Sequence, residues 1–159
     1  MEVSELLTAE AIIADLRVTS KKQALQELSK FAADLSGLSE RAIFDVLLER
    51  ERLGTTGVGD GLAIPHGRLP GLEKIQGFFV RLEKPIDFDS MDDRPVDLIF
   101  LLLAPEGAGA DHLKALARIS RLLRDAAIRE KLRGANSRDA LFALLSQTPE
   151  SSPNLRAAS

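Results

Sequence analysis

The sequence predicts an α/β fold, a single-domain sandwich in which a mixed β-sheet is flanked by helices. Short apolar runs suited to strands are separated by longer segments whose apolar residues recur at helical spacing. The run 96–103 is almost continuously apolar, as expected of a central strand covered on both faces. A chain of 159 residues suits one domain with a full core. We therefore expect one domain over 1–147 and a disordered tail over 148–159, where apolar periodicity stops.

Composition narrows the class of protein. The formal net charge of -3 gives no electrostatic reason to expect nucleic acid as a partner. The longest apolar run, 98–104, is far shorter than the roughly 20 residues that a bilayer requires, so we expect no direct membrane insertion. The absence of cysteine excludes disulfides, thiol catalysis and cysteine-ligated metals. With no signal peptide at the N-terminus, we expect a cytoplasmic protein, and we expect no cofactor.

The first third of the chain predicts one strand and two helices. Residues 12–18 alternate well enough between apolar and polar types for a half-buried strand. Ser20 and Gln23 have the spacing of a capping box, and Gly37 supplies the stop of the helix that follows. Ser39 then caps a second helix.

The second helix carries a charged residue on its apolar stripe. That stripe consists of Ile43, Val46, Leu47 and Leu53. At about 100° per residue Arg50 falls in its middle, whereas the neighbouring Glu51 points elsewhere. A guanidinium on a buried stripe needs a partner. Periodicity leaves two interpretations open: a salt bridge to a nearby carboxylate, or an arginine that reaches across to an anion site.

The next segment, 54–61, is predicted to be a loop because of its glycines. No Gly-Lys-Ser/Thr follows it, so it is not a Walker A loop, and its glycine spacing does not match the dinucleotide fingerprint. It carries two hydroxyls, Thr55 and Thr56, and leads into Pro65-His66-Gly67. Proline ends or edges a strand, and glycine leaves room beside the backbone. We expect a short strand that delivers His66 to a rigid, open rim.

The second half of the chain predicts two strands and then helices. A strand over 75–82 precedes the central strand, and four aspartates lie between the two. Their spacing is not that of an EF-hand, so a solvated turn is a better interpretation than a calcium site. Asp111 is a plausible N-cap, which puts His112 in the first turn of a helix. The inward stripe of that helix is predicted to be Leu113, Leu116, Ala117, Ser120 and Leu123. Two short helices should follow, over 125–132 and after Ser137.

His66 is the candidate for nucleophilic chemistry. A lone histidine is more often structural, but core packing gives no reason for its proline and glycine neighbours. A neutral imidazole exists near physiological pH, and one ring nitrogen attacks while the other donates to a fixed acceptor that the sequence does not identify. An inward Arg50, two loop threonines and His112 at a helix N-terminus together match phosphoryl handling. Such a terminus would also lower the pKa of His112, although an ordinary first-turn residue remains an equal interpretation.

The stretch Gly-Leu-Ala-Ile-Pro-His-Gly over 61–67 resembles the phosphorylation signature of EIIA proteins of the fructose/mannitol type, from the bacterial phosphoenolpyruvate-dependent phosphotransferase system. The segments 49–59 and 95–105 and the triplet at 111–113 are similar to three further parts of these proteins. The resemblance covers 4–147 and implies a mixed sheet flanked by helices.

The same resemblance implies the roles of the site residues. His66 would accept a phosphoryl group through Nε2 from the phosphocarrier HPr or its nitrogen-branch paralogue. Arg50 and His112 would line the site, and the loop position of Thr55 and Thr56 would let them bind the phosphoryl group. No metal is implied. We expect an apolar rim around His66, to which Leu62, Ile64 and Leu69 contribute, as a docking surface for partners.

The chain carries no fused EIIB, EIIC or HPr-like domain, which favours the nitrogen-related regulatory branch. Such proteins act as phosphorylation-dependent regulators of partners such as kinases or potassium transport systems. Three alternatives stay open. The first is the EIIA of a fructose or mannitol transporter, which passes phosphate to an EIIB. The second is a metal-dependent hydrolase that uses His66 and His112 with Asp60 or Asp111. The third is a binding protein that never takes phosphate. The hydrolase has weak support, since the histidines lack HExxH spacing.

Overall fold

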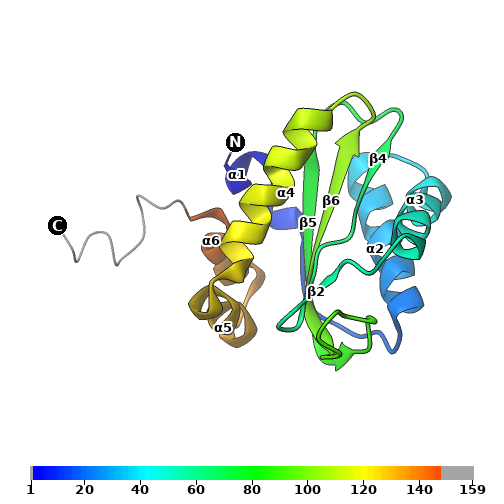
Figure 1. Ribbon diagram of the computed structural model, residues 1–159. Coiled ribbons are helices and arrows are strands. Elements are labelled where there is room, and N and C mark those ends of the chain that lie inside the picture. The colour runs from blue at the N-terminus through cyan, green and yellow to red at the C-terminus, as the bar shows by residue number, and fades with distance from the viewer. Residues whose placement is uncertain (1, 148–159) are drawn as a thin grey trace.

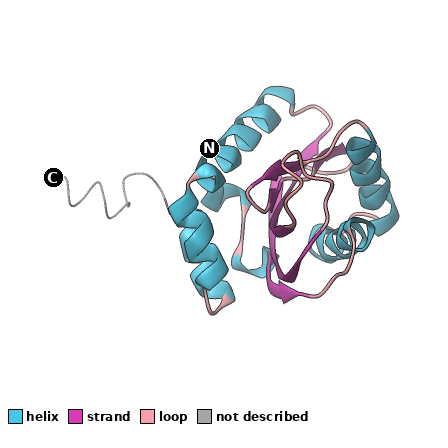
Figure 2. Cartoon of the chain, turned by 60° about the horizontal axis from the view of Figure 1, so that its bottom comes forward, coloured by secondary structure: helices cyan, strands magenta, loops and turns pink. Residues whose placement is uncertain are grey.

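The computed structural model describes residues 2–147, and the predicted tail 148–159 lies outside them. One six-stranded sheet forms the middle layer, with helices on both faces (Figure 1). Helices α2 (Lys21–Ser36) and α3 (Glu40–Arg52) cover one face. The other is covered by α1 (Val3–Leu6), α4 (Gly109–Arg124), α5 (Ala126–Gly134) and α6 (Arg138–Ser146). Figure 2 shows the strands enclosed between these two groups of helices, which confirms the predicted fold class.

Strand β6 (Val96–Pro105) is the centre of the sheet. On one side it pairs antiparallel with β5 (Gln76–Ile86), which in turn pairs parallel with β1 (Ile12–Leu16). On the other side it pairs parallel with both β3 (Leu62–Ala63) and β4 (His66–Leu69). The short β2 (Gly57–Gly59) adds antiparallel to β3. The sheet is therefore mixed, and β6 is buried on both faces as its apolar run predicts.

The predicted serine caps are confirmed. The side chains of Ser20, Ser39 and Ser137 accept backbone N–H bonds at the starts of α2, α3 and α6. Gly37 ends α2 with a φ of 78°, a left-handed conformation that glycine adopts without steric cost. These ends are set by local hydrogen bonding, which is why the sequence predicts them well.

Several element boundaries differ from the prediction. Strand β1 ends at Leu16, because the register with β5 shifts where Asp15 takes a φ of 60°. Strand β5 continues to Ile86, four residues beyond its predicted end. The predicted loop 54–61 contains β2. A short glycine-rich segment is predicted to be a loop because its own residues do not indicate the strand with which it pairs, here β3.

The phase of α4 was predicted one residue out. The helix begins at Gly109 with Ala108 as its N-cap, so Asp111 lies in the first turn and does not cap it. Its buried residues are His112, Ala115, Ile119 and Leu123. Leu113 is 65% exposed, because a histidine takes the inward position that the prediction gave to the apolar residue beside it. Within residues 2–147 no helix combines the length and apolarity that crossing a membrane requires.

At Gly67, next to His66, helix α3 packs closely against the sheet. A Cβ built at Gly67 would overlap Cγ1 of Val46, a residue of α3. The backbone of Gly67 pairs with Leu103 of β6, so it cannot move away without disturbing the sheet. The absence of a side chain at 67 therefore sets the distance between helix and strand.

We expect Gly67→Ala to lower the free energy of unfolding by about 1–3 kcal/mol, because the added methyl overpacks this contact. The measurement is urea denaturation of the wild type, Gly67→Ala, Val46→Ala and the double variant. Removing the Val46 methyls should make the second substitution less harmful than it is alone. Equal stability of Gly67→Ala and the wild type would show that the contact is loose.

Candidate functional site

His66 begins β4 directly after an interruption in the strand. Strands β3 and β4 both pair with β6, but Ile64 and Pro65 lie between them outside either strand. Pro65 has no N–H to donate, while its carbonyl still accepts from Leu102 of β6 at 3.0 Å. His66 thus lies at the start of the second strand, where the prediction had placed it at the end of the first. The interruption is held rigidly by the central strand.

The acceptor that the sequence could not identify is the carbonyl of Ile64. Nδ1 of His66 lies 2.9 Å from that oxygen. A carbonyl only accepts, so in the neutral ring Nδ1 carries the proton and Nε2 carries the lone pair. The imidazole is half-buried, which keeps its orientation fixed. The geometry therefore places the lone pair of the neutral ring on Nε2.

Arg50 faces this nitrogen. Its Nε lies 3.4 Å from Nε2 of His66, and its Nη1 donates to the carbonyl of Gly54 at 2.9 Å. Neither of these partners is a carboxylate, so within residues 2–147 these contacts do not show the salt bridge that periodicity left open, and the anion site stays a prediction. Leu53, assigned to the same apolar stripe, is instead 81% exposed because α3 ends beside it.

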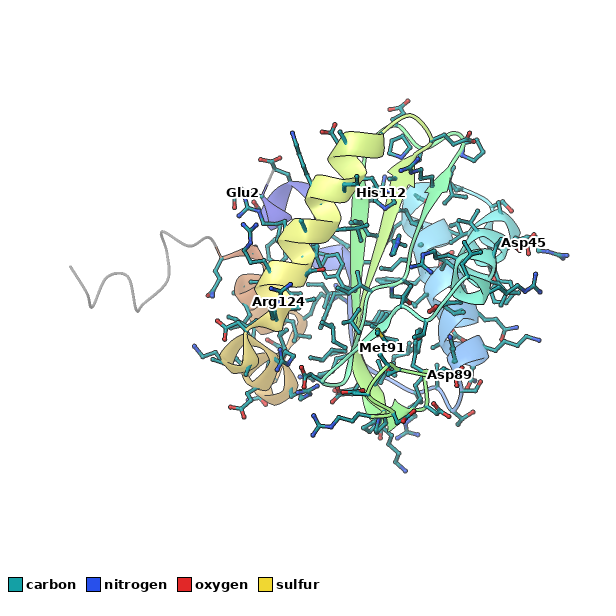
Figure 3. All side chains as sticks on the ribbon, viewed as in Figure 1. Glu2, Asp45, Asp89, Met91, His112 and Arg124 are labelled. Carbon is teal, nitrogen blue, oxygen red and sulfur yellow. The ribbon has the colours of Figure 1, made fainter. Side chains whose placement is uncertain are left out.

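His112 lies beside His66 and comes from α4, which covers the face of the sheet opposite to α3, the helix of Arg50. It projects from the sheet-facing side of α4, and the two rings are 5.5 Å apart in an edge-on arrangement (Figure 3). Its Nδ1 accepts from Nε of Arg68 at 3.3 Å, so its Nε2 carries the proton. That Nε2 is buried and has no hydrogen-bond partner within residues 2–147. The site therefore contains one ring nitrogen with a lone pair, Nε2 of His66, and one donor without a partner in the described residues, Nε2 of His112.

Sequence reasoning missed Arg68. Its role follows from the alternation of a strand, because residues two apart point to the same face. Arg68 is two residues after His66 in β4, so both side chains belong to one face of the sheet. That spacing was visible in the sequence and would have identified it.

The pKa values of both histidines are lowered. Burial is the main cause for His66; the Ile64 carbonyl raises that pKa, the charge of Arg50 lowers it, and Glu51 raises it. For His112 burial again lowers the pKa most, followed by the charges of His66 and Arg68. The lowered pKa of His112 was expected from a helix terminus, but its causes are burial and neighbouring charge. Both rings are therefore biased toward the neutral form.

The two threonines are engaged elsewhere. Thr55 donates its hydroxyl to the carbonyl of Phe88, and buried Thr56 donates its hydroxyl to Glu51. Glu51 was predicted to point away from the buried side of α3, yet it is only 9% exposed. The prediction was wrong because the loop after α3 folds back over the helix and covers this residue. Neither hydroxyl retains a proton for a ligand in this arrangement.

The expected apolar rim also differs. Leu62, Ile64 and Leu69 are buried in the core, at 4%, 4% and 2% exposure, so they cannot form a docking surface. The exposed apolar residues next to the site residues are Leu53, after Arg50 on α3, and Leu113, after His112 on α4. The expected contribution of the strand that carries His66 to an apolar rim is therefore wrong.

The structure offers little support for a metal centre. Within residues 2–147 no group of three or more His, Cys, Asp or Glu is placed to hold a metal ion. Asp60, a candidate ligand in the hydrolase alternative, pairs instead with Arg94 and Arg129. In the aspartate-rich connection, Asp92 accepts from the backbone of Asp60 and Arg94, which lowers its pKa. This connection is a turn, as predicted.

Comparison with known proteins identifies the class. The family model described as "Phosphoenolpyruvate-dependent sugar phosphotransferase system, EIIA 2" matches residues 5–148. The chain is 63% identical over 149 residues to a nitrogen regulatory protein of Bradyrhizobium diazoefficiens, covering 94% of this chain and 97% of that one. The chain belongs to this EIIA family, in its nitrogen regulatory branch.

Solved structures agree. The crystal structure of the nitrogen regulatory protein IIA-Ntr from Neisseria meningitidis matches with a TM-score of 0.86 and 39% identity, covering 90% of this chain and 98% of that one. IIA mannitol from Escherichia coli matches with a TM-score of 0.74 at 21% identity, covering 87% and 97% of the two chains. The second likeness concerns the fold alone.

We expect Arg50→Met to raise the pKa of His66. The substitution removes a positive charge that disfavours protonation, so a smaller fraction of the ring is neutral at pH 7 in the variant. NMR titration of the His66 ring protons measures this directly. Arg52→Met, at an exposed position on the same helix where Arg52 pairs with Glu49, is the matched control and should leave the pKa unchanged. Identical titration of the wild type and Arg50→Met would contradict the assigned contact.

Proposed function

We propose that this protein is a phosphohistidine carrier of the nitrogen-related phosphotransferase system. It accepts a phosphoryl group on Nε2 of His66 from an HPr-type phosphocarrier. The observation that carries the proposal is the contact between Nδ1 of His66 and the Ile64 carbonyl, which leaves the lone pair on Nε2, where it accepts from Nε of Arg50 at 3.4 Å. Burial lowers the pKa of the ring, so this lone pair is present at neutral pH.

The transfer needs no further reactant. The Nε2 lone pair forms the new N–P bond while the P–N bond in the donor phosphohistidine breaks, and that electron pair returns to the donor ring. Throughout the transfer, Nδ1 of His66 keeps its proton and donates it in a hydrogen bond to the Ile64 carbonyl. Positioning and charge stabilisation are the protein's contribution, as in phosphoryl transfer generally.

Arg50 and His112 are proposed to stabilise the negative charge of the phosphoryl oxygens. Arg50 is a cation beside Nε2, and His112 contributes an N–H that has no other partner within the described residues. In a partly buried site such donors act more strongly than in water. Thr55 and Thr56 remain predictions as phosphoryl ligands. Because their hydroxyls donate to Phe88 and Glu51, the site supports a role in fixing the loop instead.

The output of the carrier is proposed to be regulatory. Phosphorylation adds about 1.5 to 2 negative charges. Two exposed apolar residues lie close in sequence to the site residues, Leu53 after Arg50 and Leu113 after His112. A partner that docks on apolar surface there gains or loses affinity with the phosphorylation state, and sensor kinases or potassium transport systems are candidate partners. We place the protein in the cytoplasm, together with its phosphocarrier.

The second candidate is the EIIA of a sugar transporter, which the sugar-system description of the family model favours. The chemistry at His66 is the same, and only the acceptor differs. Transfer from phosphorylated His66 to a fructose- or mannitol-type EIIB would support this candidate. Retention of the phosphoryl group in the presence of such an EIIB would support the regulatory role.

Incubation with phosphoenolpyruvate, enzyme I and HPr, or with their nitrogen paralogues, should add about 80 Da to the wild type. The gain should be acid-labile and absent from His66→Ala, because that variant lacks the accepting nitrogen. Intact-mass spectrometry makes the measurement.

The same assay tests the supporting residues. His112→Ala should be phosphorylated about a hundredfold more slowly than the wild type, since one charge-stabilising donor is lost. Arg52→Gln on the neighbouring exposed position is the control and should keep the wild-type rate. No gain of mass with either donor pair, or an equal gain in His66→Ala, would sink the carrier mechanism.

A further inference from the structure

Glu51 is a buried carboxylate that the proposed transfer does not yet use. Its side chain is only 4% exposed, and its two oxygens accept from the backbone N–H of Thr56 at 3.0 and 2.9 Å. It also accepts the Thr56 hydroxyl, and Nζ of Lys21 lies 3.7 Å away. A buried charge is costly unless it is paired and hydrogen-bonded. These contacts satisfy Glu51, and they concentrate on a single residue of the loop before the signature.

Thr56 connects this carboxylate to the site. Its carbonyl accepts from the backbone N–H of Ile64 at 3.0 Å. The carbonyl of Ile64 is the acceptor for Nδ1 of His66, at 2.9 Å. A continuous series of hydrogen bonds therefore runs from Glu51 through Thr56 and Ile64 to the imidazole.

The series crosses the interruption in the sheet. Ile64 lies between β3 and β4, outside either strand. The N–H of Ile64 is held by Thr56, which lies just before β2 and is held in turn by Glu51. The central strand holds the same segment one residue later, where the Pro65 carbonyl accepts from Leu102, so the bond from Ile64 to Thr56 is the contact that acts on Ile64 itself.

We propose that Glu51 is a positioning residue for phosphoryl transfer. Through Thr56 it fixes the Ile64 carbonyl, which accepts from Nδ1 of His66 and so acts together with Arg50, which donates to Nε2, to keep the proton on Nδ1 and the lone pair on Nε2. The proposal rests on the proposed carrier function for its consequence, because the tautomer matters only if Nε2 is the nucleophile. The tautomer itself can be measured without any phosphotransfer.

The test separates hydrogen bonding from charge at position 51. Glu51→Met fills a similar volume but accepts no hydrogen bond, whereas Glu51→Gln keeps an amide oxygen for the N–H of Thr56. Glu49→Met is the matched control, because Glu49 lies in the same turn but is exposed and pairs with Arg52. Nitrogen-15 NMR of the His66 ring, in unphosphorylated protein at a pH where the ring is neutral, reports which nitrogen carries the proton.

The wild type, Glu49→Met and Glu51→Gln should show Nδ1 protonated. Glu51→Met should show a detectable population of the Nε2-protonated tautomer beside the Nδ1-protonated one, which Arg50 still favours, and a kcat for phosphorylation lowered about tenfold, with the KM for the phosphocarrier unchanged. If Glu51→Met does not fold, Thr56→Val provides the test, since it deletes the hydroxyl that Glu51 accepts and keeps the two bonds from the backbone N–H. It should shift the tautomer in the same direction but by less, whereas Thr56→Ser should not shift it.

A wild-type tautomer in Glu51→Met, or in Thr56→Val where the first variant is unfolded, would overturn the proposal. Loss of rate with an unchanged tautomer would overturn it as well, because the effect would then come from elsewhere. Failure of the wild type to accept phosphate from either donor pair would instead count against the proposed function, while the NMR result would still decide the role of Glu51.

Discussion

The hydrogen bond between Nδ1 of His66 and the Ile64 carbonyl is the interaction on which the site depends. The strand is interrupted at Ile64 and Pro65, and there the Ile64 carbonyl accepts from the ring of His66, two residues later. The interruption is tolerated because β6 pairs with the chain on both sides of it. The central, buried strand β6 thus supports an interrupted part of the sheet, and the ring of His66 lies there.

Two histidines in opposite tautomers give the site its polarity. His66 presents a lone pair at Nε2, whereas His112 presents a proton at Nε2, because one Nδ1 meets a carbonyl and the other a guanidinium. Burial lowers the pKa of both rings, which favours the neutral form of each. Arg50 and Arg68 supply positive charge without competing for the proton, since guanidinium groups stay charged.

The sequence predicts those features whose causes are local. Serine caps, the apolar run of β6 and the rigid flanks of His66 are each decided by a few neighbouring residues, and the phase of Arg50 follows from helical periodicity. Glu51 escaped prediction because the predicted stripe included Leu53, which is exposed, whereas the buried residues Ile43, Leu47 and Glu51 recur every four residues and the loop after α3 covers the last of them. The Ile64 acceptor depends on a strand interruption that only the paired sheet defines. The phase of α4 was wrong because a functional histidine occupies a position where periodicity looks for an apolar side chain.

In the proposed transfer, Nε2 of His66 takes the phosphoryl group, while Nδ1 keeps its proton and donates it in a hydrogen bond to the Ile64 carbonyl. Phosphorus-31 and nitrogen-15 NMR of the phosphorylated, nitrogen-15-labelled protein tests this most directly. We expect phosphorus bonded to Nε2, with the Nδ1 proton still present and protected by its hydrogen bond to the Ile64 carbonyl. Phosphorus on Nδ1 of His66 would mean that the Ile64 carbonyl does not hold the proton there. Phosphorus on His112 would mean that His66 is not the acceptor.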